Sequence, residues 1–125
     1  METNGFQQYK DQSVNTMTQG ELLLLLYDEL VKRLVRSKLA LDTENYELFD
    51  AEVERSSEII RYLDRTLDRS YESGNDLHRL YDFFCYELSR VRFGRNKEEL
   101  ERVTRMVREL RDSFQIAQKN NSSGK

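Results

Sequence analysis

His78 is the residue whose type most readily suggests chemistry, because it is the only histidine in the chain. It falls in a stretch predicted to be helical, and Asp82 follows four residues later on the same helix face. A histidine on one helix of a four-helix bundle can accept a phosphoryl group, but the negative charge of Asp82 would repel that group. We therefore expect His78 to be an ordinary surface residue and keep a histidine phosphotransfer bundle as an alternative hypothesis.

Other catalytic and metal-binding arrangements lack the residues that they need. A di-iron bundle uses Glu-x-x-His twice, and a zinc site needs more ligands than the single Cys85 and the single His78 provide. The sequence contains no glycine-rich phosphate loop, and a serine nucleophile would have no histidine base other than His78. We predict that the protein is not an enzyme and that it uses no metal or cofactor.

The composition favours one all-α domain. Of the 125 residues, 34% are charged, none is Pro and only five are Gly, so most of the chain can be helical. The net charge of −3 argues against a nucleic-acid partner, which would favour a basic surface. The leucine run at 22–26 is far shorter than the ~20 apolar residues of a membrane-spanning helix, so we expect no direct membrane insertion. The polar N-terminus, and a lone Cys85 that cannot form an internal disulfide, predict a cytoplasmic location.

Capping residues and hydrophobic periodicity divide the chain into four helices. Thr18 with Glu21 forms a capping-box pattern at the start of the first helix, and Asn96 with Glu99 opens the fourth. Ser73 is the expected cap of the third helix. The expected helices cover residues 19–41, 44–69, 75–92 and 97–117.

Short connections between helices of this length predict an antiparallel up-down four-helix bundle over residues 18–118. Residues 1–17 contain few apolar side chains, so we expect a mobile N-terminal arm, and we expect the polar residues 119–125 to form a disordered tail. Each helix carries apolar residues three or four positions apart that would face a common core. The expected core residues are Leu23, Leu26, Tyr27, Leu30, Leu34, Leu41, Phe49, Val53, Ser56, Ile60, Leu63, Leu67, Leu77, Leu80, Tyr81, Phe84, Leu88, Val91, Leu100, Val103, Val107, Leu110, Phe114 and Ala117.

Four arginines recur every third residue in the last helix, at Arg102, Arg105, Arg108 and Arg111. A step of three residues drifts by about 60° on an α-helix, so this row winds around the helix and is interleaved with acidic residues. We expect a solvated, ion-paired face rather than a basic stripe.

Several apolar residues are left over once the core stripes are assigned. Helical periodicity places them away from the core face of the second and third helices, which should be antiparallel neighbours, so they could line an apolar groove on the outside of the bundle. Such a groove suits a partner helix, although single exposed apolar residues are also common in proteins without such a site. The expected groove residues are Leu48, Ile59, Tyr62, Phe83, Tyr86 and Phe93, and the N-terminal Phe6 and Tyr9 could occupy the groove when no partner is bound.

The order of these motifs resembles the flagellar secretion chaperones of the FliS type. The similarity runs from Tyr9 to Phe114 and is carried by Thr16-x-Thr18, the leucine run that leads into Tyr27-Asp28, and the second Leu-Tyr-Asp sequence at 80–82. The family commonly has Thr-x-Ser-Pro where this chain has Thr16-Met17-Thr18-Gln19. Thr18 keeps the capping role, and proline at the first helical position is favourable but optional.

The resemblance implies a cytoplasmic bacterial protein that binds the C-terminal segment of flagellin and stops it polymerising before flagellar type III export. It also implies delivery to the flagellar export gate, and an N-terminal segment that caps the binding surface and takes part in binding, for which Phe6 and Tyr9 are the matching residues. No catalysis or cofactor is implied. A generic helical adaptor for another amphipathic helix stays an alternative, and the oligomeric state, monomer or weak dimer, stays open.

Overall fold

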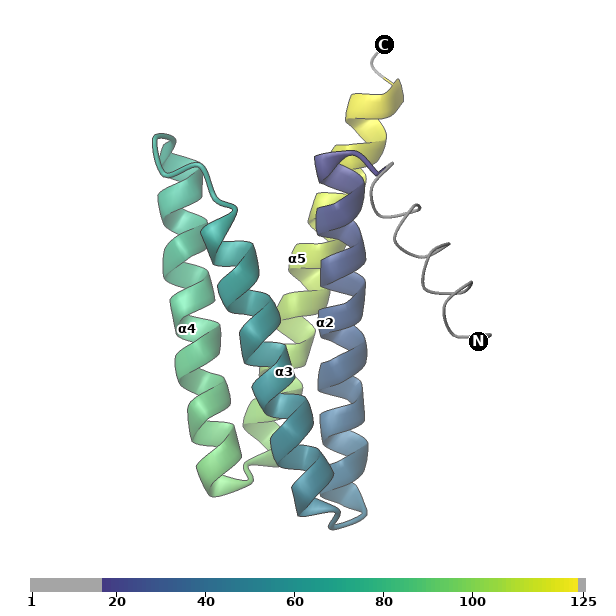
Figure 1. Cartoon of the computed structure of the whole chain (residues 1–125), viewed down its shortest axis with the longest axis vertical. Helices are drawn as coiled ribbons and strands as arrows, with labels where there is room; N and C mark the ends of the chain where they lie inside the picture. The colour runs from purple at the N-terminus through teal and green to yellow at the C-terminus, as the bar shows by residue number, and fades with distance from the viewer. Residues whose placement is uncertain (1–16, 124–125) are drawn as a thin grey trace, which may run out of the picture.

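The computed structural model describes the backbone of residues 17–123 and the side chains of residues 17–120. Within this part of the chain the helices are α2 (Gln19–Asp42), α3 (Tyr46–Arg65), α4 (Glu72–Gly94) and α5 (Lys97–Ser123). They run alternately up and down (Figure 1), and α2 and α4 each pack against both α3 and α5. The predicted antiparallel four-helix bundle is confirmed. None of the described helices is long and apolar enough to cross a membrane.

Local hydrogen bonds explain where three of the helices begin. The backbone N–H of Glu21 donates to the Thr18 hydroxyl at 3.1 Å, and this hydroxyl donates in turn to the Glu21 carboxylate. The side chain of Asn96 accepts from the backbone N–H of Glu99 at 3.0 Å, and Asn45 caps α3 in the same way. These bonds satisfy backbone donors that have no partner within the helix. The predicted caps Thr18 and Asn96 are confirmed.

The connection between α3 and α4 is longer than expected. α3 ends at Arg65 rather than at 69, and α4 begins at Glu72 rather than near 75. Between them, the Asp68 carboxylate accepts hydrogen bonds from both the backbone N–H and the hydroxyl of Ser70. Such side-chain bonds compete with helical ones, which explains the early end of α3. Ser73 lies inside the first turn of α4, so the expected cap at this residue was wrong.

α5 extends to Ser123, past the expected end at 117 and through much of the segment 119–125 that we expected to be a disordered tail. Neither Pro nor Gly occurs between Lys97 and Ser123, so nothing in the sequence stops the helix earlier. Its last turns are held close to α2, because the side chain of Gln118 fills the space beside Gly20 where a Cβ would otherwise lie. The expected N-terminal arm, apart from Met17, lies outside the described residues.

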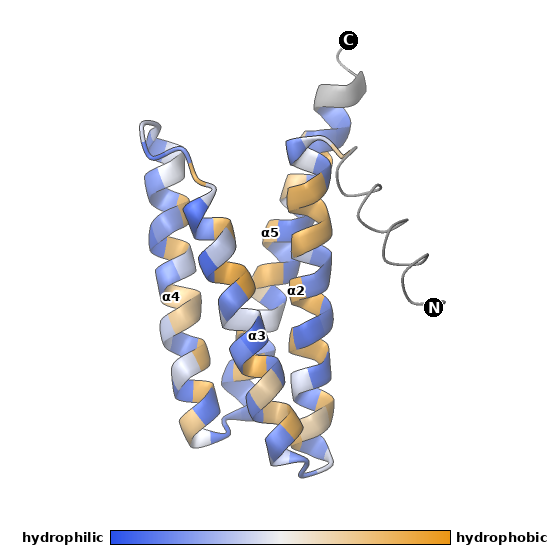
Figure 2. Ribbon diagram, in the orientation of Figure 1, coloured by the Kyte–Doolittle hydropathy of each residue, from blue (hydrophilic) through white to orange (hydrophobic). Residues whose placement is uncertain are grey.

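The core follows the predicted stripes closely. Figure 2 shows the apolar residues in stripes between hydrophilic ones, with a concentration in the first turns of α2. Eight of the expected core residues, including Leu23, Leu77 and Phe114, are partly buried and pack against the fully buried ones, whereas Ala117 is exposed. The expected core residues that are fully buried are Tyr27, Leu30, Leu34, Phe49, Val53, Ser56, Ile60, Leu63, Tyr81, Phe84, Leu88, Val91, Leu100, Val103 and Val107.

Candidate partner-binding surface

Four of the eight predicted site residues expose a large apolar side chain. Phe93 at the end of α4 is 87% exposed and Tyr86 is 62% exposed, and Leu48 and Tyr62 on α3 are exposed as well. The other two described residues, Ile59 and Phe83, are partly buried and pack against the core. Phe6 and Tyr9 lie outside the described residues.

The exposed residues do not converge on one groove. Leu48 lines a depression of about 460 Å³ between α2 and α3, together with Leu39 of α2. Phe93 lines a smaller depression of about 130 Å³ between α3 and α4. Phe83 faces α5, since the guanidinium of Arg102 lies 5.7 Å from the centre of its ring. The expectation of a single groove shared by these residues was wrong, because the apolar arcs of α3 and α4 are wide enough to reach both neighbouring helices.

The α3–α4 depression combines apolar and arginine side chains. Val53 and Leu88 form its apolar part, and Arg61 and Arg92 lie at its edge. Arg92 pairs with Glu54 of α3 at 3.0 Å, which joins the two helices across the depression. Aromatic and arginine side chains are the residues most enriched in the energetically important parts of interfaces. Phe93 beside these arginines therefore has the composition of a partner-binding site.

Cys85 also lines this depression but is not equipped for chemistry. Its thiol is half-buried, and burial raises its pKa, with the positive charge of Arg61 acting in the opposite direction. A thiol with a raised pKa carries little thiolate at neutral pH and is a weak nucleophile. We interpret Cys85 as part of the apolar lining.

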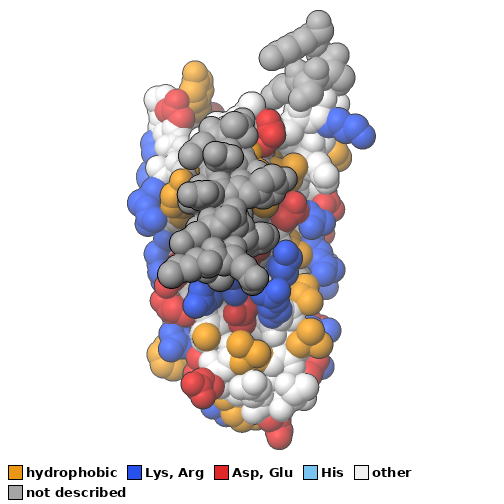
Figure 3. Space-filling model, turned by 45° about the vertical axis from the view of Figure 1, so that its right-hand side comes forward, with side chains coloured by type: hydrophobic (Ala, Val, Ile, Leu, Met, Phe, Trp, Pro, Cys, Tyr) orange, Lys and Arg blue, Asp and Glu red, His pale blue; other side chains and the backbone are white. Residues whose placement is uncertain are grey.

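The α2–α3 depression contains a residue that the sequence analysis missed. Leu39 is 59% exposed and lies beside Leu48, with Arg36 at the edge. Figure 3 shows hydrophobic side chains in the lower half of the face that includes α2, with a band of Lys and Arg side chains above them. Leu39 precedes the core residue Leu41 by two positions, a rotation of about 200° on an α-helix. That offset was the signal in the sequence that Leu39 points outward.

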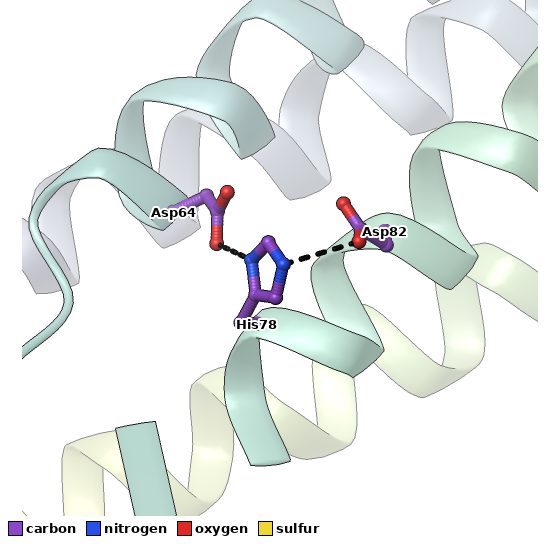
Figure 4. A group of neighbouring side chains, drawn as sticks. All are labelled: Asp64, His78 and Asp82. Atoms are coloured by element: carbon purple, nitrogen blue, oxygen red, sulfur yellow. Dashed lines mark hydrogen bonds and ion pairs between the residues drawn. The ribbon is translucent and has the colours of Figure 1, made fainter. Parts of the chain in front are cut away.

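His78 sits between two carboxylates rather than in an open site. Its Nδ1 is 2.7 Å from Asp64 of α3 and its Nε2 is 3.2 Å from Asp82, one turn further along α4 (Figure 4). Both ring nitrogens are therefore occupied, and a phosphoryl group would have to approach between two negative charges. This geometry argues against phosphotransfer and makes His78 a link between α3 and α4.

The same three residues do not form a convincing metal site. Their potential ligand atoms lie within 4.8 Å of one another, but the two carboxylates lie on opposite sides of the imidazole (Figure 4). A metal ion bound by one ring nitrogen would have only one of the two carboxylates on its own side. We interpret the three residues as a hydrogen-bonded cluster that positions the helices.

Comparison with known proteins agrees with the helical bundle. The family model described as flagellar protein FliS matches residues 2–121 of this chain. The flagellar secretion chaperone FliS of Bacillus subtilis (strain 168) is 28% identical over 114 residues, which cover 91% of this chain and 86% of that protein. A crystal structure of a flagellar chaperone from bacteria superposes with a TM-score of 0.76 over 96% of this chain and 99% of that chain, and its 16% identity makes it evidence for the fold.

FliS proteins are chaperones and not enzymes, and the match gives no support to catalysis. Because the family model covers nearly the whole sequence, this chain belongs to the FliS family of flagellar secretion chaperones, which supports a chaperone role in flagellar export.

Proposed function

We propose that this protein binds the C-terminal segment of flagellin in the cytoplasm, prevents it from polymerising too early, and delivers it to the flagellar export gate. The observation that carries the proposal is the exposed aromatic surface of α3 and α4, made by Tyr62, Tyr86 and Phe93. Single exposed apolar residues are common, but several exposed aromatic side chains on two adjacent helices have the composition of a partner-binding surface. Membership of a flagellar chaperone family supports the same role.

The spread of these residues over several sides of the bundle favours an elongated ligand. Leu48 lies on the α2 side of α3, and Phe93 lies over the α3–α4 depression. One straight partner helix in one groove would not reach both places. A segment that is unfolded when free can wrap around the bundle and contact separate anchors in turn. This arrangement suits a chaperone that must cover the apolar stripe of its cargo and keep it extended enough for export.

The bundle gives such a ligand a rigid support. The residues beneath the exposed aromatics, among them Phe84, Leu88 and Ile60, are fully buried, so the anchors are held in place before binding. The cargo has to be ordered when it binds, and this ordering cost offsets part of the contact energy. A moderate affinity follows, which permits release at the export gate.

Titration calorimetry with a peptide of the C-terminal ~40 residues of the organism's flagellin tests the proposal, and we expect a markedly negative heat-capacity change as apolar surface is buried. We expect one peptide per chaperone. The chaperone should also slow the polymerisation of flagellin, and an excess of the peptide should relieve this inhibition because it competes for the same surface. Absence of heat at several temperatures together with a failed pull-down would remove flagellin as the ligand.

A double variant locates the binding surface. Tyr62→Glu with Tyr86→Glu should leave the helical content unchanged and weaken peptide binding by at least about tenfold, the effect of losing roughly 1.4 kcal/mol of contact energy. The matched control is Tyr71→Glu with Ile116→Glu, which adds the same two charges elsewhere: Tyr71 is 64% exposed in the connection between α3 and α4, and Ile116 is 61% exposed on α5. Equal losses in both variants would mean that the added charge, and not the surface, matters.

Phe6 and Tyr9 remain proposed contacts of the N-terminal segment with the cargo. Phe6→Glu with Tyr9→Glu should weaken binding of the same peptide, and an unchanged affinity would exclude them. We further propose that the free protein is a monomer or a weak dimer. Light scattering over a range of concentrations measures this directly, and a stable dimer at low concentration would contradict it.

A further inference from the structure

A third hollow lies between α2 and α5, on the side of the helix ring opposite to α3 and α4. Its volume is about 320 Å³, and its apolar floor is made by Leu34, which is buried, and Val35, which is half-buried. Polar and charged side chains of both helices form the rim: Lys38, Glu101, Thr104, Arg105 and Arg108. None of the residues proposed above to bind flagellin lines this hollow, which we call the α2–α5 groove.

The α2–α5 groove carries positive charge that the bundle does not neutralise. Lys38 pairs with Glu101 across the groove at 3.1 Å. Arg105 and Arg108 make no ion pair with any residue in the described part of the chain. The other two arginines of the same row do pair: Arg102 with Glu99 at 2.6 Å, and Arg111 with Asp112 at 3.0 Å.

The expected ion-paired face therefore holds for Arg102 and Arg111 but not for the two arginines between them. The chain as a whole has a net charge of −3, so a groove whose lining is net positive stands out from its surroundings. At short range, this local positive charge favours acidic partners over basic ones.

We propose that the α2–α5 groove binds an acidic amphipathic helix of a partner protein. A trough between two antiparallel helices accommodates a third helix alongside them, and Val35 provides apolar contact for its buried stripe. Arg105 and Arg108 are three residues apart, about 4.5 Å along the axis of α5. Acidic side chains one turn apart on the docking helix would face both arginines.

Apolar contact and charge have separate roles in this interaction. Exposed ion pairs each contribute little to affinity, typically about 0.2–1 kcal/mol. Leu34 is fully buried, so Val35 is the floor residue that offers apolar contact, and we expect a weak interaction. The two arginines provide specificity for an acidic partner, because a basic helix in the same place would meet two like charges. The groove shares no lining residue with the proposed flagellin surface, so the two sites can be altered separately.

A synthetic helix serves as the probe. Its sequence has a leucine stripe and glutamates one turn apart over about 18 residues, or roughly five turns, and a matched peptide has lysine at every glutamate position. Fluorescence anisotropy with the full chain should show binding of the acidic peptide and at least tenfold weaker binding of the basic one. Equal affinity for the two peptides, or no binding of either, would overturn the proposal.

Charge reversal in the chain locates the site. Arg105→Glu with Arg108→Glu should weaken binding of the acidic peptide at least tenfold and leave flagellin-peptide binding unchanged. The control, Arg36→Glu with Arg55→Glu, changes the net charge equally on α2 and α3 and should have little effect. Equal losses in the two variants would show attraction to the whole chain and not to the groove.

Two further measurements keep the test decisive. Arg105→Glu with Arg108→Glu could lose helical content. In that case Arg105→Gln with Arg108→Gln removes the two positive charges without adding negative ones, and this variant should also bind the acidic peptide more weakly than the unmutated chain does. A photo-crosslinker attached at Thr104→Cys, in a Cys85→Ser background, should label the acidic peptide, whereas the same crosslinker at Tyr86→Cys should not. Labelling at Tyr86→Cys alone would place the peptide on the cargo surface and contradict the proposal.

Discussion

The hydroxyl groups of Tyr27 on α2 and Tyr81 on α4 hydrogen-bond to each other inside the bundle. Both side chains are buried, and both come from a Leu-Tyr-Asp sequence whose aspartate, Asp28 or Asp82, is exposed. α2 and α4 are not neighbours in the helix ring, so this bond joins two helices across the core. The repeated tripeptide therefore places one polar pair within an otherwise apolar centre.

A double-mutant cycle on the two tyrosines measures this pair. Tyr27→Phe or Tyr81→Phe leaves the other hydroxyl buried without its partner, which should lower the free energy of unfolding by about 1–3 kcal/mol. The double variant removes both hydroxyls, so its loss should be smaller than the sum of the two single losses. Urea unfolding followed by circular dichroism gives all three values. Additive losses would mean that the two hydroxyls do not interact in solution.

The same tyrosines predict a loss of stability at alkaline pH. Burial raises the pKa of Tyr27 and of Tyr81, and for Tyr81 the neighbouring Tyr27 raises it further. The folded protein then holds these protons more tightly than the unfolded chain, whose tyrosine pKa is about 10. Their stabilising contribution is complete below about pH 10 and falls as the pH rises above that value.

Urea midpoints measured from about pH 8 to pH 11 span this window. The wild-type midpoint should fall more steeply above the unfolded tyrosine pKa than that of the variant with both Tyr27→Phe and Tyr81→Phe. Parallel curves for the two proteins would assign the alkaline loss to other groups.

The buried carboxylate of Glu52 on α3 predicts an asymmetric response to mutation. Its Oε1 lies 3.0 Å from Nη1 of Arg33 on α2, and Arg33 also pairs with Glu29 at 3.0 Å. Arg33→Ala leaves a buried negative charge without its partner and should cost about 3–5 kcal/mol. Glu52→Ala leaves an arginine that keeps Glu29 and some solvent contact, so its cost should be smaller, about 1–2 kcal/mol. Thermal unfolding of both variants ranks them, and the reverse order would refute this account.

Two glycines of α4 predict opposite effects of the same substitution. A Cβ at Gly74 would collide with the backbone carbonyl oxygen of Asp68, whereas a Cβ at Gly94 would meet no atom within 4 Å. Gly74→Ala should therefore destabilise the protein by about 1–3 kcal/mol, since a backbone carbonyl moves only with its whole connection. Gly94→Ala should be neutral or stabilise by up to about 1 kcal/mol through helix propensity. Melting temperatures that move in the same direction would contradict the close approach at Gly74.

At the candidate surface, the sequence predicted the exposure of some apolar residues correctly and of others wrongly. Periodicity correctly separated Tyr86 and Phe93 from the core stripe of α4. It also placed Ile59 and Phe83 outside, although both pack against the core. Apolar residues at the margin of a wide stripe are covered or exposed according to how far the helix is rotated in the bundle. That rotation is set by the side chains of other helices. The ring of Phe83, for example, is partly shielded from solvent by Arg102 of α5.

The sequence by itself determined the features that depend on near neighbours. The cap at Thr18 needs only Glu21 three residues away, and the core positions Leu30 and Leu34 need only a regular 3–4 spacing in one helix. The FliS-type motifs are likewise contained in short stretches, which is why the sequence alone indicates the family.

Only the tertiary structure decided the relationships between residues far apart in the chain. Three relationships depend on which helix faces which, and at what height: the contact of Tyr27 with Tyr81, the approach of Asp64 to His78, and the lack of an ion pair for Arg105 and Arg108 among the described residues. Hydrophobic burial is non-directional, so an apolar stripe dictates that a helix packs but not how it meets its neighbours. Close packing of side chains from all four helices selects one rotation and one register, and these place the charged and aromatic side chains on the surface.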